Sequence, residues 1–99
     1  MNMLCNKLYT IKYQDSNSAI ITLCDEKHPI FKAHFPSQPI LPAFVHFEIV
    51  GDIFNLDITT IKKAKFTKII TPLQTIKYEK NDNKFKVFCK DAEVASFSL

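Results

Sequence analysis

Hydrophobic and polar side chains alternate along the first quarter of the chain. Residues 7–13 place aromatic or aliphatic side chains at every second position, and residues 19–24 form a second short apolar run. The residues between them, Q-D-S-N-S, favour a turn because their short polar side chains bond the backbone locally. A period of two is typical of β-strands, so the pattern predicts a β-hairpin over residues 8–24.

The same period returns after residue 60. Residues 61–70 place Ala64, Phe66 and Ile70 on one face, and a proline follows shortly afterwards. Turn-forming residues then separate further alternating runs, and the N-D-N sequence of the first turn tolerates positive φ. We expect an antiparallel meander of three strands. Its strands are predicted at residues 73–80, 84–90 and 93–99, with a second turn at Asp91 and Ala92.

The middle of the chain follows neither pattern. Residues 28–51 contain four of the five prolines, all three histidines and the only glycine. Proline cannot continue a helix interior and biases its predecessor towards extended geometry, so residues 28–41 are predicted to form a stiff, irregular loop. Pro42 suits the first position of a helix, where its missing N–H costs nothing. This helix is expected to end near Phe54, and its nearly all-round apolar character predicts burial on most sides.

One long helix among antiparallel strands defines an α+β fold class. A sheet wrapped around a single central helix covers the apolar faces of both. The 99 residues, 46% of them apolar, suffice for one domain spanning residues 1–99 and leave no room for a second. A core of this size is modest, and oligomerisation often supplements it.

Charge and cysteine content narrow the classes of function. The formal charge of +3 comes with thirteen lysines and no arginine, an excess too small and dispersed to indicate nucleic-acid binding but suited to an acidic protein partner. Three cysteines far apart in sequence are interpreted as reduced thiols of a cytoplasmic protein, and no metal-ligand spacing accompanies them. The sequence shows no signal peptide and no stretch of the ~20 apolar residues that a membrane span needs.

Residues 28–48 carry a fairly specific motif. They read H-P-I-F-K-A-H-F-P-S-Q-P-I-L-P-A-F-V-H-F-E. This resembles the hotdog-fold 3-hydroxyacyl-[acyl-carrier-protein] dehydratases, whose pattern is approximately H-P-x-F-x-G-H-F-P-G-x-P-x-x-P-G followed by a helical Glu or Asp. The spacing from His34 to Glu48 matches that between the family's catalytic histidine and acid. The resemblance continues more weakly into K-A-K-F at residues 63–66, and the chain is similar to short members of the group.

The resemblance implies a lyase of bacterial fatty acid biosynthesis that removes water from 3-hydroxyacyl thioesters. His34 would be the base and Glu48 the acid, contributed by different subunits of a homodimer. A carboxylic acid in an apolar site keeps its proton more readily, which suits an acid in this role. The backbone N–H of Ala43 would polarise the thioester carbonyl. The implied substrate-binding residues are Phe35, Pro36, Leu41, Ala43 and Phe44.

The resemblance also implies the partner. No cofactor is expected, because the substrate would arrive on the phosphopantetheine of acyl carrier protein or on coenzyme A. An acidic carrier would meet basic residues after the helix, where lysine acts as a point charge. The candidates are Lys62, Lys63, Lys65 and Lys68.

Three departures from the family pattern leave a second function open. Ala33, Ser37 and Ala43 stand where the family has glycine, the residue for positive φ or close backbone approach. The alternative is a non-catalytic hotdog protein that binds an acyl thioester or its carrier. A hotdog thioesterase is a third candidate, but thioesterases lack this proline-rich frame. His46 is interpreted as structural, since it lies about 200° around the helix from Glu48. His28 is interpreted as part of the loop structure.

Overall fold

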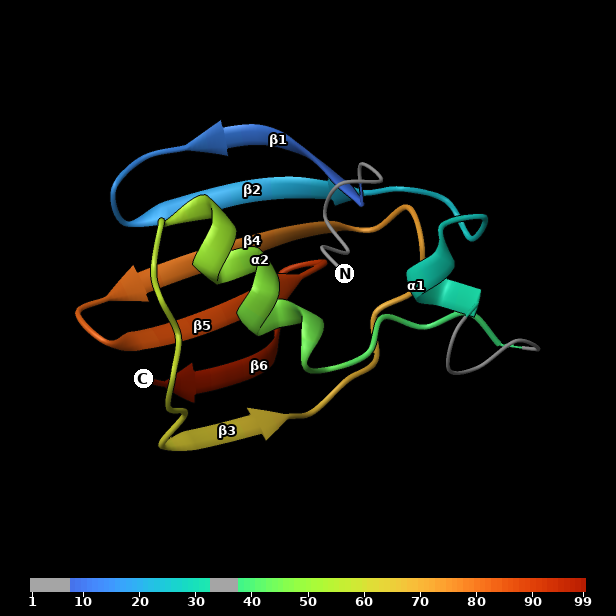
Figure 1. Cartoon of the computed structure of the whole chain (residues 1–99). Helices are drawn as coiled ribbons and strands as arrows, with labels where there is room; N and C mark the ends of the chain where they lie inside the picture. Colours follow the sequence, from blue (N-terminus) through green and yellow to red (C-terminus); the bar gives the residue numbers. More distant parts are fainter. Residues whose placement is uncertain (1–7, 33–37) are drawn as a thin grey trace.

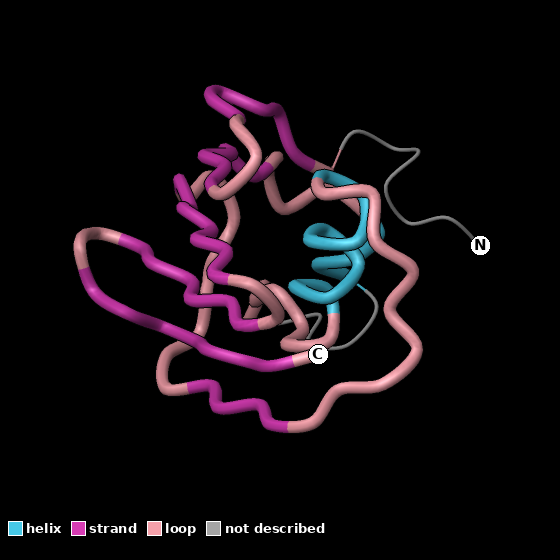
Figure 2. Tube along the Cα trace, turned by 90° about the vertical axis from the view of Figure 1, so that its left-hand side faces the viewer, coloured by secondary structure: helices cyan, strands magenta, loops and turns pink. Residues whose placement is uncertain are grey.

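The computed structural model describes residues 8–32 and 38–99. Within these ranges, one antiparallel sheet curves around a central helix (Figure 1). The view turned by 90° shows the helix on one side of the curved layer of strands (Figure 2). The elements are β1 (Tyr9–Gln14), β2 (Ser18–Leu23), α1 (Pro29–Lys32), α2 (Val45–Ile53), β3 (Lys63–Phe66), β4 (Thr75–Asn81), β5 (Lys84–Cys89) and β6 (Ala92–Ser98).

The strands follow one another in the order β1-β2-β4-β5-β6-β3, and every pair of neighbours is antiparallel. The predicted hairpin is confirmed by the pairing of β1 with β2, in which Tyr9 lies opposite Leu23. The predicted meander is confirmed as β4, β5 and β6. Asp82 in its first turn has a φ of 54°, as an N-D-N turn allows. The strands β1 and β3 therefore form the two edges of the sheet.

The inward face of the sheet and one face of α2 form the core. Ile21, Ile76 and Tyr78, from β2 and β4, are fully buried, and so are Val45 and Ile49 of α2. Burying an aliphatic side chain of this size stabilises the fold by about 2 kcal/mol. This packing fixes the orientation of α2 on the sheet, and with it which helix side chains remain at the surface.

Two expectations for the middle of the chain were wrong in detail. Residues 28–41 are not irregular throughout, because the short helix α1 forms at Pro29, a residue suited to the first helical position. The regular part of the central helix begins at Val45 and not at Pro42. The preceding turn is tighter, since the N–H of Val45 donates to the carbonyl of Pro42 (3.0 Å), three residues back.

The segment after α2 also differs from the prediction. Only Lys63–Phe66 of residues 61–70 forms a strand, and all four of its residues are exposed in the single chain. Ile70 is buried, whereas Ala64 and Phe66, predicted to share its face, are exposed. The regular pairing of β3 with β6 ends at Phe66, and the carbonyl of Ile70 accepts from the N–H of Leu41, in the segment before α2.

Candidate functional site

The backbone N–H groups at the start of α2 differ in whether they have a partner among the described residues. The N–H groups of Val45, His46 and Phe47 donate to carbonyls three residues earlier, at 3.0, 3.2 and 3.1 Å. No side chain caps the helix at Phe44. Within residues 8–32 and 38–99, the N–H of Ala43 has no hydrogen-bond partner. It lies at the positive end of the helix dipole, where an oxygen carrying partial negative charge is stabilised.

A cavity of about 200 Å³ opens beside this turn. One wall comes from the N-terminal end of α2 and the segment before it, and the other comes from the end of β3 and the segment after it. The two walls are joined by a backbone hydrogen bond from the N–H of Leu41 to the carbonyl of Ile70 (2.7 Å). The lining residues are Leu41, Ala43, His46, Phe66, Thr67, Lys68, Ile69 and Ile70.

His46 is the buried polar residue of this cavity. Its Nδ1 lies 2.8 Å from the hydroxyl of Tyr78, and both side chains are buried. Its ring stacks on Phe66, with centroids 6.1 Å apart and planes 13° from parallel. Burial lowers the pKa of His46 to about 4 and raises the pKa of Tyr78, so both groups are neutral near pH 7.

Glu48 lies on a different face of the helix. The buried residues of α2 face the sheet, while Phe44, Glu48 and Asp52 are exposed. Seven of the nine residues of α2 are buried or half-buried, so the predicted burial on most sides is confirmed, and the face of Glu48 and Asp52 is the exception. The apolar surroundings expected for Glu48 are missing among the described residues of one chain, because its flanking residue Ile49 points into the core.

The structure brings together some of the sequence-predicted residues and separates others. Leu41 and Ala43 line the same cavity. Phe44, 42% exposed, does not line it and lies on the uncovered face with Glu48. The other predicted residues fall outside the described ranges, as do two of the three positions where the family has glycine. These undescribed residues are His34, Phe35 and Pro36, and Ala33 and Ser37.

The hydrogen bond between His46 and Tyr78 was not predicted from the sequence. The sequence places His46 on an otherwise apolar helix, and this was interpreted as structural. The signal that distinguishes it is Tyr78, a buried tyrosine on an inward strand position. No local spacing links the two residues, because they are 32 positions apart.

The uncovered face of α2 continues into the edge of the sheet. Phe47, half-buried, meets Phe66 of β3 edge to face, with ring centroids 5.9 Å apart. Exposed apolar side chains nearby include Ile61 and Ile69, at 38% and 60%. The lysines predicted to meet a carrier are exposed in the same region. They are Lys62, Lys63, Lys65 and Lys68.

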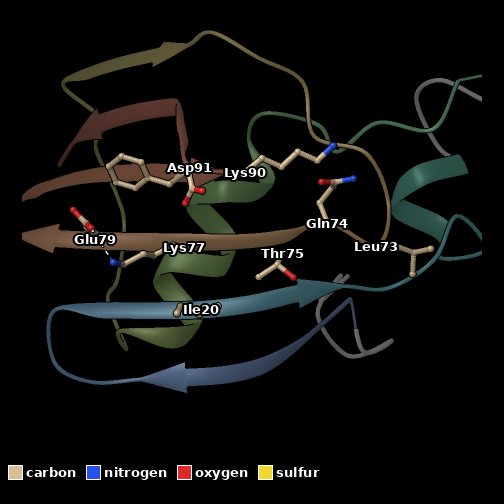
Figure 3. Close-up of a pocket in the computed structure, with 9 residues that line it drawn as sticks. Ile20, Leu73, Gln74, Thr75, Lys77, Glu79, Lys90 and Asp91 are labelled. Carbon is tan, nitrogen blue, oxygen red and sulfur yellow. Dashed lines mark ion pairs between the residues drawn. The ribbon is translucent and has the colours of Figure 1, made fainter.

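A second hollow lies on the face of the sheet away from α2 (Figure 3). It has a volume of about 660 Å³ and runs along β2, β4 and β5. Its polar wall includes an ion pair between Lys77 and Glu79 at 3.2 Å. None of the residues predicted as catalytic or substrate-binding lines it.

Neither metal ligation nor a membrane span finds support in the described part of the chain. His, Cys, Asp and Glu side chains form no cluster of three or more there that could hold a metal ion. Cys24 and Cys89 are free thiols, and burial raises the pKa of both. Among these same residues, no helix is long and apolar enough to cross a bilayer.

One antiparallel sheet wrapped around one central helix defines a hotdog fold. The family model described as ApeI-like, ApeI dehydratase, matches residues 10–98. The chain therefore belongs to the ApeI-like dehydratase family. No curated protein matches the sequence.

Two solved structures share the fold. A chain of the dehydratase heterocomplex ApeI:P from Xenorhabdus doucetiae has a TM-score of 0.64 at 20% identity, covering 89% of each chain. An uncharacterized protein from Erwinia carotovora subsp. atroseptica has a TM-score of 0.52 at 19% identity, covering 88% of this chain and 85% of that chain. At such identities these likenesses establish the fold and leave the substrate open.

Proposed function

We propose that the protein is a dehydratase acting on 3-hydroxyacyl thioesters carried on phosphopantetheine, with His34 as base and Glu48 as acid. The observation that carries the proposal is the unpaired N–H of Ala43 at the start of α2, in a chain of the ApeI-like dehydratase family. This N–H lies where the family motif puts the contact to the thioester carbonyl. It borders a cavity with an aliphatic wall at Leu41, which suits an acyl chain.

The proposed chemistry needs a base, an acid and a carbonyl contact. The imidazole of His34 takes the proton from C2, and the electron pair left behind forms the C2=C3 double bond. The bond from C3 to its hydroxyl breaks, and the proton of Glu48 converts the departing hydroxyl to water. The N–H of Ala43 stabilises the negative charge that develops on the thioester oxygen meanwhile.

A homodimer would complete this site. Glu48 is exposed among the described residues of one chain, whereas a general acid works best in apolar surroundings that favour its neutral form. The edge strand β3 has backbone groups free for pairing, and apolar side chains border it. A second copy placed on this edge would cover both features, and the family resemblance implies that His34 and Glu48 would come from different subunits. A different partner chain is the alternative, as the heterocomplex relative suggests.

An acidic carrier protein is the proposed donor of the substrate. Lys62, Lys63, Lys65 and Lys68 are exposed around β3, next to the cavity wall formed by residues 66–70. Their charges would attract an acidic surface and speed association at low salt. A cytoplasmic location and a role in fatty acid synthesis belong to the same proposal.

The direct test is enoyl-thioester hydration and 3-hydroxyacyl dehydration, followed by absorbance with short and medium chains. Wild-type turnover that falls by orders of magnitude in both His34→Ala and Glu48→Gln supports the acid–base pair. No turnover by a folded protein that still binds acyl-pantetheine would favour the non-catalytic alternative. Release of free acid in place of enoyl or hydroxyacyl product would indicate a thioesterase.

A further inference from the structure

The hydrogen bond between His46 and Tyr78 determines which ring nitrogen of His46 carries the proton. The Tyr78 hydroxyl is fully buried, and within the described chain His46 Nδ1, at 2.8 Å, is its partner. A buried hydroxyl must donate to avoid the cost of an unpaired donor, and a neutral imidazole nitrogen is a good acceptor. Nδ1 therefore accepts from Tyr78. The proton of the neutral ring is left on Nε2.

This Nε2–H belongs to a ring that lines the cavity beside α2. His46 is 3% exposed, and its Nδ1 edge is occupied by Tyr78 in the core. A helical side chain leans towards the N-terminus, so His46 lies over the turn that starts at Ala43. Ala43 and His46 both line the cavity. A backbone donor and a buried side-chain donor thus share one small space, whose lining is apolar apart from Thr67, Lys68 and His46 itself.

From this arrangement we infer that His46 is a second donor to the carbonyl oxygen of the thioester, acting beside the N–H of Ala43. Tyr78 is a positioning residue that holds His46 in the donating tautomer. The inference rests on the proposed function and extends it. Two donors fixed before the reaction stabilise the charge that develops on oxygen when C2 loses its proton, and they do so more effectively in a largely apolar cavity than in water.

The first test measures binding without turnover. S-butyryl-pantetheine has the carbonyl, and its thioether analogue S-butyl-pantetheine lacks it; neither has a 3-hydroxyl to eliminate. For the wild-type protein we expect the thioester to bind about five- to tenfold more tightly, the worth of one or two hydrogen bonds. His46→Leu should lose most of this preference. His46→Gln should retain it, because the amide can also donate.

The outcomes separate this inference from the proposed function. An equal thioester preference in wild type and His46→Leu would overturn the role of His46 and leave the dehydratase proposal intact. If neither compound binds the wild-type protein, the proposed function fails and the inference falls with it. Thermal melts of both variants establish that each is folded under the binding conditions.

The second test needs no substrate. Nitrogen-15 shifts of the histidine ring distinguish the two neutral tautomers, and we expect His46 of the wild-type protein to carry its proton on Nε2. Tyr78→Phe removes the donor to Nδ1 and should shift the ring towards a mixture of tautomers, while reducing the thioester preference. A wild-type ring protonated on Nδ1 would overturn the inference without any variant being made.

Discussion

The ring of Phe47, on α2, meets the ring of Phe66, on the edge strand β3, with planes at 66° to one another. Phe47 also packs edge to face on Phe97 of β6, at a centroid distance of 4.9 Å. Phe44 lies one turn before Phe47, and residues three apart share a helix face. The uncovered face of α2 and the open edge of the sheet are therefore one continuous surface.

The first prediction concerns this surface. Phe44→Glu should convert the proposed homodimer to a monomer, because a charge would be buried at the centre of the contact. Phe44 is 42% exposed in the single chain, and thermal melts of the variant establish that its monomer is folded. Sedimentation velocity measures the change in mass.

Ile11 provides a matched control for Phe44→Glu. It is 45% exposed and lies on β1, at the opposite edge of the sheet. Ile11→Glu should leave the dimer intact. A wild-type monomer at micromolar concentration, or a dimer that survives Phe44→Glu, would rule out this surface as the interface.

The second prediction concerns the acid. Glu48→Gln should lower dehydration by about 10²- to 10⁴-fold, the usual contribution of a general acid, with little effect on folding. Glu26→Gln is the matched control, since Glu26 is another exposed glutamate and lies outside α2. It removes the same charge and should change turnover less than about threefold, within the range of remote surface substitutions. Equal losses in the two variants would show that Glu48 acts only through charge or stability.

The strands were predictable because their signal is local. Alternation over a few residues is enough to identify β2, β4, β5 and β6, whose inward positions are buried. Residues 61–70 show the limit of the same signal. Ile70 continues the alternation, yet its carbonyl accepts from Leu41 and not from a strand, and this contact between distant segments has no local pattern.

The candidate site was only partly predictable for a related reason. The proline-rich motif pointed to the start of α2, and the structure puts Leu41 and Ala43 on one cavity there. The apolar character of α2 predicted burial that a single chain does not provide at Phe44 and Glu48. Side chains that the proposed second chain would bury resemble core residues in sequence. His46 is hydrogen-bonded to Tyr78, which lies 32 positions later in the sequence, and no local pattern predicts this contact.

The third prediction concerns the contact that joins β1 to α2. The Tyr9 hydroxyl donates to the carboxylate of Asp52, and burial, together with this partner, raises the pKa of Tyr9. Tyr9→Phe and Asp52→Asn should each destabilise the fold, with a coupling energy of about 1 kcal/mol in a double-mutant cycle measured by urea unfolding. Additive effects would mean that the bond contributes nothing to stability. Tyr13→Phe, on the same strand but exposed and bonded to Asp15, supplies the comparison.

The last prediction concerns pH. The pKa of His46 is about 4 in the folded protein because of burial, against 6.5 for an ordinary histidine. Between these values the unfolded chain binds a proton that the folded chain excludes. The free energy of unfolding should therefore fall as the pH falls from 6.5 to 4, by on the order of 3 kcal/mol in total. Tyr78, the group facing His46 Nδ1, stays neutral throughout.

Urea unfolding at several pH values between 7 and 4 measures this slope. His46→Gln keeps a neutral polar group beside Tyr78 and should lose the slope in this window. The pKa of the Asp15 carboxylate is lowered to about 2, chiefly by the hydrogen bond from Tyr13. Asp15 in the folded protein therefore titrates below pH 4 and does not mask the slope that His46 produces between pH 6.5 and pH 4. Parallel slopes in the wild-type protein and His46→Gln would show that His46 takes up a proton as readily in the folded state as in the unfolded chain. That result would also place the ring in contact with water, where a hydrogen bond to a bound thioester would be worth far less than in a closed cavity.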